Sequence, residues 1–130
     1  MLLSQHQDVR RSLAKEYNGA FPSTPPKFGE VRDLDYSRQV VSESLRRYPP
    51  AWIVDRYALN EDEANGYHIP KGSTIAAYVY GAHHNKEHWN DPYQFDPSRF
   101  QKEEMKDIHP FAYFPSVSYT HLTLPTIYSV

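Results

Sequence analysis

The chain has 130 residues, a formal net charge of −2 and no cysteine. This length allows one modest domain or part of a larger one, and the lack of cysteine excludes disulfides, thiolate metal sites and cysteine nucleophiles within it. The basic residues are dispersed, which argues against a nucleic-acid partner. No apolar run is long enough to span a membrane and no signal-peptide pattern is present, so a cytoplasmic location is expected.

The first amphipathic helix is expected near the start of the chain. Val9, Leu13 and Tyr17 recur at four-residue spacing, which predicts a helix over residues 7–17. Asn18-Gly19 is expected to close it, because both residues tolerate a positive φ. The segment 21–29 contains three prolines and is predicted to be an exposed connector.

The second helix is predicted over residues 36–48. Asp35 is a suitable N-cap, since its carboxylate can accept hydrogen bonds from the amides of the first turn. The apolar face of this helix is expected to consist of Val41, Leu45 and Tyr48. Pro49-Pro50 ends the helix because proline cannot donate the next hydrogen bond.

A small antiparallel sheet is expected after the second helix. Residues 52–58 are predicted to form a strand and the polar residues 60–65 a loop. Residues 66–69 and 74–80 flank Pro70-Lys71-Gly72, which predicts a hairpin in which these two segments pair. The rest is expected to be a short helical turn within 81–90, irregular structure over 91–100 and a charged, exposed stretch over 101–107.

Glu43 and Arg46 lie three residues apart on one face of the second predicted helix. Pairs of this kind are common on helix surfaces, where each stabilises the helix by only about 0.2–0.5 kcal/mol. The E-x-x-R spacing by itself is therefore weak evidence of function, and an exposed ion pair is its plainest interpretation.

Three histidines, His83, His84 and His88, raise the alternative of a zinc site. His84 and His88 have the i, i+4 spacing of a zinc-binding helix, but no H-E-x-x-H pattern is present and Glu87 is poorly placed as its general base. The tyrosines could stack on bases, yet no basic groove would hold the phosphates. The sequence therefore predicts neither a metal site formed by protein side chains nor nucleic-acid binding.

The residues that follow Glu43-Ser44-Leu45-Arg46 make the E-x-x-R spacing stronger evidence of function. It is followed by Arg56, then by the segment G-Y-H-I-P-K-G over residues 66–72, and then by Pro97-Ser98-Arg99-Phe100. In this order and spacing, residues 1–115 closely resemble the cytochrome P-450 family, the haem-thiolate monooxygenases. The joint occurrence of the three motifs is highly specific, although each motif alone is not.

The resemblance implies roles for several residues. Glu43, Arg46 and Arg99 would form a buried charge network behind the haem, and Arg56 would pair with a haem propionate, whose geometry suits a guanidinium. The plainer alternative for Arg56 is a surface arginine at a strand end. The substrate pocket would be lined in part by Ala51, Trp52, Ile53 and Val54, for which ordinary strand packing is the alternative.

His83 falls at the histidine of the family's H-R-D-P-x-x-W segment, which packs and hydrogen-bonds rather than binding metal. Here His84, Asn85 and Lys86 replace the Arg, Asp and Pro of that segment. The local match is therefore imperfect.

The implied fold is an α+β fragment of a mainly-α cytochrome P-450 fold, with residues 7–17 as the J helix and 36–48 as the K helix. A small antiparallel β-sheet and an irregular C-terminal part complete it. The implied activity is the insertion of one atom of O₂ into an apolar organic substrate. It requires haem b, with electrons from NAD(P)H arriving through a redox partner of the reductase or ferredoxin/flavodoxin type.

The composition changes abruptly at Ser116. All 14 basic and 16 acidic residues precede it. Residues 109–115 resemble the approach to the family's haem-binding cysteine loop, but S-V-S-Y follows instead of that loop. Residues 117–126 resemble a translated sequencing adapter of the transposase type. We therefore interpret 1–115 as a partial cytochrome P-450 domain and 116–130 as a non-native tail, with a natural divergent C-terminus as the alternative.

Without a cysteine no thiolate can bind the iron, so the chain as written is expected to be inactive. Two other classes remain open. A small non-enzymatic α+β binding or structural module would need a self-contained core and would unfold cooperatively in isolation. A histidine-based zinc protein would carry stoichiometric metal after purification.

Overall fold

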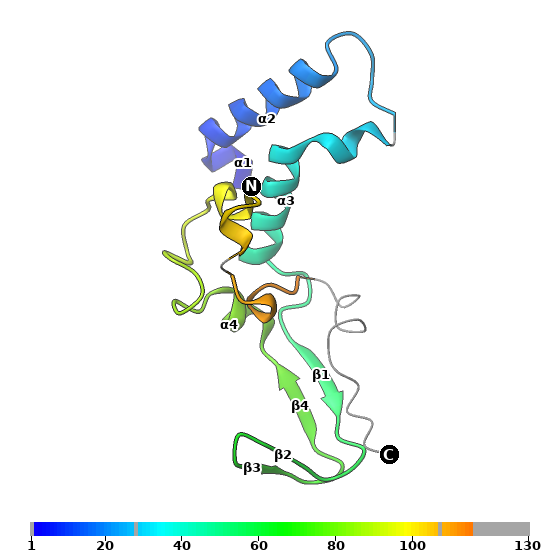
Figure 1. Cartoon of the computed structure of the whole chain (residues 1–130), viewed down its shortest axis with the longest axis vertical. Helices are drawn as coiled ribbons and strands as arrows, with labels where there is room; N and C mark the ends of the chain where they lie inside the picture. The colour runs from blue at the N-terminus through cyan, green and yellow to red at the C-terminus, as the bar shows by residue number, and fades with distance from the viewer. Residues whose placement is uncertain (1, 28, 107, 116–130) are drawn as a thin grey trace.

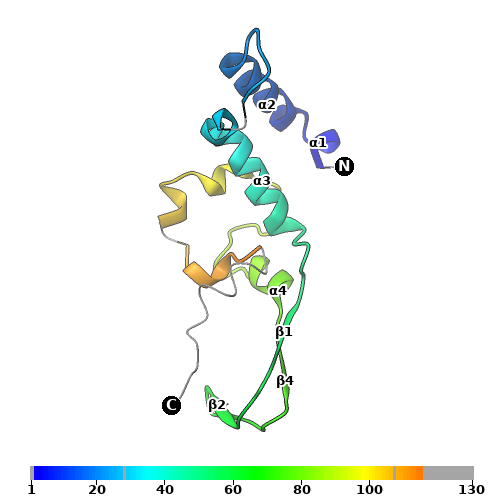
Figure 2. The same ribbon diagram turned by 90° about the vertical axis from the view of Figure 1, so that its right-hand side faces the viewer.

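The computed structural model describes residues 2–27, 29–106 and 108–115, so the proposed boundary at Ser116 lies outside the described residues. The molecule is elongated, with helices at one end and a long arm of strands at the other (Figures 1 and 2). This combination of helices with small antiparallel sheets confirms the predicted α+β class. In the described part of the chain, no helix is both long and apolar enough to cross a lipid bilayer.

The regular elements, in chain order, are α1 (Leu2–Gln5), α2 (Gln7–Ala20), α3 (Asp35–Arg47), β1 (Val54–Tyr57), β2 (Asp62–Ala64), β3 (Tyr67–Ile69), β4 (Thr74–Ala77) and α4 (Val79–His83). Short 3-10 helices at Glu30–Asp33, Pro97–Phe100, Glu104–Lys106 and Pro110–Ala112 punctuate the connections. The irregular part predicted for 91–100 therefore ends in a helical turn.

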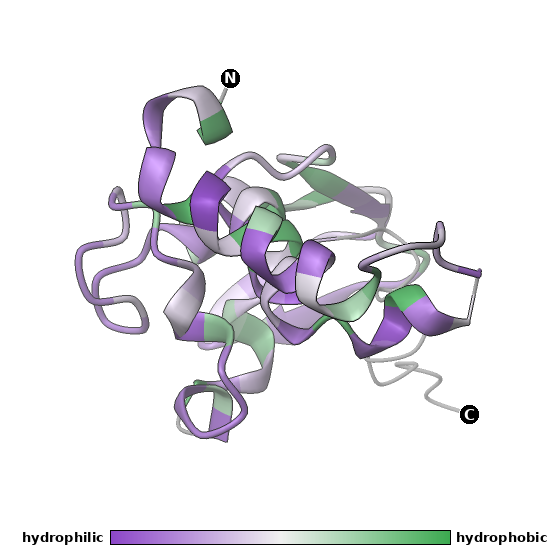
Figure 3. Cartoon of the chain, turned by 90° about the horizontal axis from the view of Figure 1, so that it is seen from above, coloured by the Kyte–Doolittle hydropathy of each residue, from purple (hydrophilic) through white to green (hydrophobic). Residues whose placement is uncertain are grey.

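The first amphipathic helix is confirmed as α2, but it continues through Asn18-Gly19. It ends at Ala20, and the next residue, Phe21, has a non-helical φ of −131° while its amide still donates to the Tyr17 carbonyl at 2.8 Å. Val9 faces inward and joins a small hydrophobic cluster with Val40 and Phe95. In Figure 3 the hydrophobic stretches of the helices alternate with hydrophilic ones, as expected for half-buried helices.

The second helix is confirmed as α3, but two of the three residues of its predicted apolar face are exposed and only Leu45 is half-buried. Val41 is 57% exposed and Tyr48 is 60% exposed, whereas the buried positions are Val40, Glu43 and Arg46. The face that turns inward therefore carries an acid and a base. Hydrophobic periodicity could not find it, because that method looks for apolar side chains at the buried positions.

Asp35 does not act as the predicted N-cap of α3, because Leu34 occupies that position and provides no side-chain cap. The cap comes from α2 instead. The Glu16 carboxylate accepts hydrogen bonds from the Tyr36 amide at 2.6 Å and from the Ser37 amide at 2.8 Å. It also accepts from the Ser37 hydroxyl at 2.6 Å, so three donors at the start of α3 depend on a neighbouring helix.

These contacts predict that the attachment of α2 to the start of α3 weakens at acidic pH. Partial burial would raise the pKa of Glu16, but the hydrogen bonds from Ser37 and Tyr36 outweigh it and hold that pKa below its ordinary value. The stabilisation is therefore present above the ordinary glutamate pKa and is lost as the pH falls through the lowered one. Glu16→Gln should cost about 1 kcal/mol at neutral pH, measured by urea unfolding.

The control for this prediction is Glu61→Gln, which changes an exposed glutamate. It should leave the unfolding midpoint unchanged at neutral pH. Equal midpoints for the two variants would contradict the cap at Glu16.

The strand pairing differs from the predicted hairpin. β4 pairs with β1, with Val54 opposite Ala77, and β3 pairs with β2, with Asp62 opposite Ile69. The turn at Pro70-Lys71-Gly72 is present, with the Ser73 amide donating to the Pro70 carbonyl at 3.1 Å. It joins strands of two different sheets, so the shorter hairpin lies at the tip of the longer one (Figure 1).

The signal for the tip hairpin is Asn65-Gly66. Both residues have positive φ, 50° and 80°, as a two-residue hairpin turn with right-handed twist requires. The predicted loop over 60–65 therefore contains β2, which ends one residue before this turn. Asn-Gly between short polar strands is a hairpin signal despite the acidic composition of the segment.

α4 begins where the predicted strand 74–80 was expected to continue, and its last residue, His83, is fully buried. The rings of Tyr113 and Phe114 pack against it, with centroids 5.4 and 5.5 Å from that of His83. The segment 110–115 returns to this region and lies beside α4 in both ribbon views (Figures 1 and 2). The chain thus gathers α3, α4 and its last described segment around one centre.

Candidate functional site

A buried ion pair lies near the C-terminal end of α3. Glu43 and Arg46 are both 0% exposed. The Arg46 Nε donates to Glu43 Oε2 at 2.6 Å and its Nη2 donates to Oε1 at 2.8 Å. This bidentate geometry is the strongest way for a guanidinium to hold a carboxylate. The interpretation of the pair as an exposed surface contact is therefore wrong.

Arg46 also donates to three backbone carbonyls in two other stretches of the chain. Its Nη1 donates to the His83 carbonyl at 2.7 Å, and its Nη2 donates to the carbonyls of Pro92 at 2.8 Å and Gln94 at 3.3 Å. The guanidinium also lies over the ring of Trp89, 5.0 Å from its centroid. A single buried cation therefore fixes α4 and the 92–94 loop on α3, since each carbonyl is satisfied by it.

Arg99 approaches the same acid from the Pro97–Phe100 helix. Its Nε lies 3.9 Å from Glu43 Oε1, an ion pair without a hydrogen bond, and its Nη2 donates to the Asp91 carbonyl at 3.0 Å. The Asp96 amide donates to Glu43 Oε1 at 3.1 Å. The structure thus brings Glu43, Arg46 and Arg99 together, with the acid between two guanidinium groups.

His83 links this centre to the last described segment. Its Nδ1 lies 3.2 Å from the Arg46 carbonyl oxygen, and its Nε2 accepts a hydrogen bond from the Phe114 amide at 3.0 Å. The pKa of His83 is lowered to about 4, chiefly by burial and also by the charges of Arg46 and His84, against the raising effect of the hydrogen bond to the Arg46 carbonyl. The ring is therefore neutral at physiological pH.

His84 is also buried, at 6% exposure. Its Nδ1 lies 2.8 Å from the Tyr80 carbonyl oxygen, and its Nε2 is 3.4 Å from Arg47 Nη1. Burial lowers its pKa, and the positive charges of Arg46 and Arg47 act in the same direction. Both imidazoles therefore use their ring nitrogens in protein contacts.

The zinc alternative finds no support in the side-chain arrangement. In residues 2–27, 29–106 and 108–115, no group of three or more His, Cys, Asp or Glu side chains could hold a metal ion. His88 instead stacks on His109, with centroids 5.7 Å apart.

The predicted cofactor and substrate residues lie elsewhere, on the strand arm and at its base. Arg56 is exposed in the middle of β1, where its Nη1 donates to the Asp55 carbonyl at 2.8 Å. Trp52 is 58% exposed and Ile53 is 40% exposed, while Ala51 and Val54 are half-buried. Two of the four predicted pocket residues are therefore exposed and two are half-buried, and their role in a substrate pocket stays a prediction.

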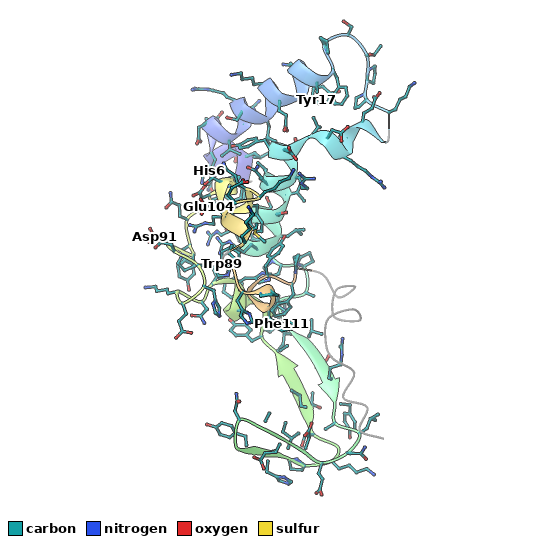
Figure 4. All side chains as sticks on the ribbon, viewed as in Figure 1. His6, Tyr17, Trp89, Asp91, Glu104 and Phe111 are labelled. Atoms are coloured by element: carbon teal, nitrogen blue, oxygen red, sulfur yellow. The ribbon has the colours of Figure 1, made fainter. Side chains whose placement is uncertain are left out.

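Trp89 is the largest fully buried side chain in the described part of the chain, and it was not predicted to be central. Figure 4 shows it in the middle of the molecule, between the helices and the strand arm. Its Nε1 donates to the Ala112 carbonyl at 3.2 Å. Nearby, the Tyr113 hydroxyl donates to the Ser42 carbonyl at 3.1 Å. The sequence signal that could have identified Trp89 is its match to the last residue of the H-R-D-P-x-x-W segment.

Comparison with known proteins agrees with this geometry. A family model described as Cytochrome P450 matches residues 1–115. Over 114 residues, or 87% of this chain, it is 39% identical to mouse cytochrome P450 3A11 and 38% identical to rat cytochrome P450 3A2, in each case spanning 23% of the relative. It is 35% identical to goat cytochrome P450 3A19, of which it spans 52%. With the E-x-x-R pair and the arginine of P-x-R-F meeting at one buried acid, the chain belongs to the cytochrome P450 family.

Proposed function

We propose that this chain is part of a haem-dependent monooxygenase and supplies the charge network that anchors the region next to the haem. The observation that supports the proposal is the burial of Glu43 between Arg46 and Arg99. In this proposal α2 corresponds to the J helix and α3 to the K helix. The network sets the positions of α4 and the 92–99 segment relative to α3, because its hydrogen bonds join all three.

The parent protein would insert one atom of O₂ into an apolar organic substrate. Haem b would supply the oxygen chemistry when bound, and NAD(P)H would supply electrons through a redox partner of the reductase or ferredoxin/flavodoxin type. Arg56 is the proposed contact to a propionate, since its guanidinium is accessible and matches a carboxylate. The proposed pocket residues, Ala51 to Val54, would contribute part of the substrate surface.

The residues present do not form a complete haem site. The sequence contains no cysteine that could provide an axial thiolate. Arg56, on an exposed strand, is the single residue here to which a haem contact is assigned. We therefore derive no catalytic step from this chain and expect it to be inactive as written.

Haem titration tests this expectation. The purified chain is mixed with haem, reduced and treated with carbon monoxide, and the absorption spectrum is recorded. We expect no thiolate-type Soret band, because the thiolate is what shifts the band in this family. A thiolate-type band in this cysteine-free chain would contradict the assignment of the missing ligand.

The same proposal places the end of the family domain at Pro115. The family match ends at residue 115, the residue before the charge-free stretch begins, which supports treating 116–130 as a non-native tail. Amplification of the gene from its source tests this directly. Finding residues 116–130 encoded in native DNA would reject the adapter hypothesis and leave the P450 assignment of 1–115 intact.

A further inference from the structure

Two consecutive histidines, His83 and His84, are buried at the end of α4 and face two consecutive arginines of α3. The Phe114 amide can only donate, so His83 Nε2 must be unprotonated to accept its hydrogen bond. In the neutral ring the proton is then on Nδ1, where it can be donated to the Arg46 carbonyl at 3.2 Å.

The same reasoning applies to His84. The Tyr80 carbonyl can only accept, so Nδ1 carries the proton across the 2.8 Å contact. Arg47 Nη1 can only donate, so Nε2 must be unprotonated at 3.4 Å. The ring is also held between two aromatic rings, with centroids 4.1 Å from that of Tyr80 and 5.1 Å from that of Tyr93. Both histidines thus require the same neutral tautomer.

We propose that His83 and His84 are positioning residues, locked as neutral Nδ1–H tautomers, which hold α4 on the end of α3 and fix the segment 110–115. His83 joins three parts of the chain. It is the last residue of α4, its Nδ1 contacts the Arg46 carbonyl of α3, and its Nε2 accepts a hydrogen bond from the Phe114 amide. His84 fixes the side chain of Arg47 beside it. The inference concerns this chain's own packing, and it goes beyond the proposed oxygenase function.

The charged and titratable groups around the pair all oppose its protonation or leave it neutral, with one exception. Arg46 and Arg47 of α3 carry positive charge, which disfavours a second positive charge on either ring. A proton on His84 would also lower the pKa of His83. Tyr80, Tyr93 and Tyr113 present aromatic rings. Glu43 is the exception, but its carboxylate is already held by Arg46 and faced by Arg99.

The first test reads the tautomers of the full 130-residue chain, labelled with ¹⁵N at histidine, by nuclear magnetic resonance. His83 and His84 should show the Nδ1–H form and stay neutral below pH 6.5, where an ordinary histidine becomes protonated. His6 Nδ1 also lies 2.9 Å from a carbonyl oxygen, that of Leu2, so its signal is set apart by assignment. Assignment uses His83→Phe and His84→Phe, each of which removes one signal. If the signals of His83 and His84 titrate normally or lack this tautomer, the proposal is overturned. A chain that does not fold would give the same overturning result.

The second test separates hydrogen bonding from packing. His83→Asn can still donate to the Arg46 carbonyl but is too short to accept from the Phe114 amide. His83→Gln reaches the Phe114 amide, and His83→Phe keeps the stacking on Tyr113 while losing both hydrogen bonds. Hydrogen exchange at the Phe114 amide should be about tenfold faster in the Asn and Phe variants, corresponding to about 1.4 kcal/mol, and near the parent rate in the Gln variant.

The exposed histidine of β3 provides the matched control. His68→Phe makes the same change of side chain away from α3 and should leave the Phe114 amide unchanged. Unchanged exchange in His83→Phe would show that His83 only fills space, and equal exchange in the Asn and Gln variants would show that its Nε2 is not the acceptor. Either result overturns the proposal. The proposed oxygenase function would stand in both cases, since it depends on Glu43 and not on His83.

Discussion

Glu43→Gln should lower the free energy of unfolding by about 3–5 kcal/mol, the loss typical when one partner of a buried ion pair is removed. The reason is the guanidinium that remains. Arg46 is 0% exposed, so in the variant its charge stays in the interior without a counter-ion at hydrogen-bonding distance. The Arg99 guanidinium also loses the acid 3.9 Å from its Nε. Because domains of this size are stable by about 5–15 kcal/mol, the loss is a large fraction of the total stability and should lower the urea midpoint clearly. Urea unfolding followed by circular dichroism measures the effect.

Glu63→Gln is the control for this prediction, because it makes the same chemical change on the exposed strand β2. It should shift the unfolding free energy by less than about 0.5 kcal/mol. Arg46→Lys offers a further check, since an ammonium cannot reproduce the bidentate contact and also reach three carbonyls. A Glu43 variant as stable as the Glu63 variant would show that the pair is not buried in solution.

Trp89→Ala should cost about 3–5 kcal/mol, as large-to-small changes at buried aromatic positions do. Trp89 is 1% exposed, so its removal leaves a cavity beside the rings of Phe100 and Tyr113, which cannot fill it without movement. The substitution also removes the donor to the Ala112 carbonyl and the ring beneath the Arg46 guanidinium. Trp89→Phe should cost less, because it keeps an aromatic ring and loses only the hydrogen bond and part of the volume.

The second tryptophan of the chain is the control. Trp52 is 58% exposed, so Trp52→Ala should change the unfolding free energy far less than Trp89→Ala. Intrinsic fluorescence adds a second readout, because each single variant retains one tryptophan. A buried Trp89 should emit at shorter wavelength than Trp52, and equal emission maxima would contradict the described core.

The helices were predictable because their signals are local. Apolar spacing located α2, and Pro49-Pro50 located the end of α3. The buried face of α3 was not predictable in this way, because Glu43 and Arg46 look like an ordinary surface pair until their burial is known. The cap on α3 was missed for a related reason, since Glu16 lies on a different helix.

The strand pairing could not be derived from turn signals alone. Pro70-Lys71-Gly72 does form a turn, but a turn does not determine that its two flanking segments pair with each other. The Asn65-Gly66 turn, a stronger hairpin signal, joins β2 to β3, and β4 pairs with β1 instead. In the candidate site, Glu43, Arg46 and Arg99 were predicted through the family resemblance, because they match its motifs. The contacts of His83 and Trp89 depend on segments distant in sequence, which no spacing rule brings together.

The arm formed by β1 and β4 has a consequence for handling the isolated chain. All of β4 and most of β1 are exposed, and the side chains of Tyr57 and Ile75 are 67% and 43% exposed. Within the described residues each sheet has two strands, so both outer rows of backbone donors and acceptors are open. Such ladders recruit further strands from neighbouring molecules. Self-association should therefore begin at this arm, and lysine introduced along its outer rows is the change most suited to keeping concentrated samples monodisperse.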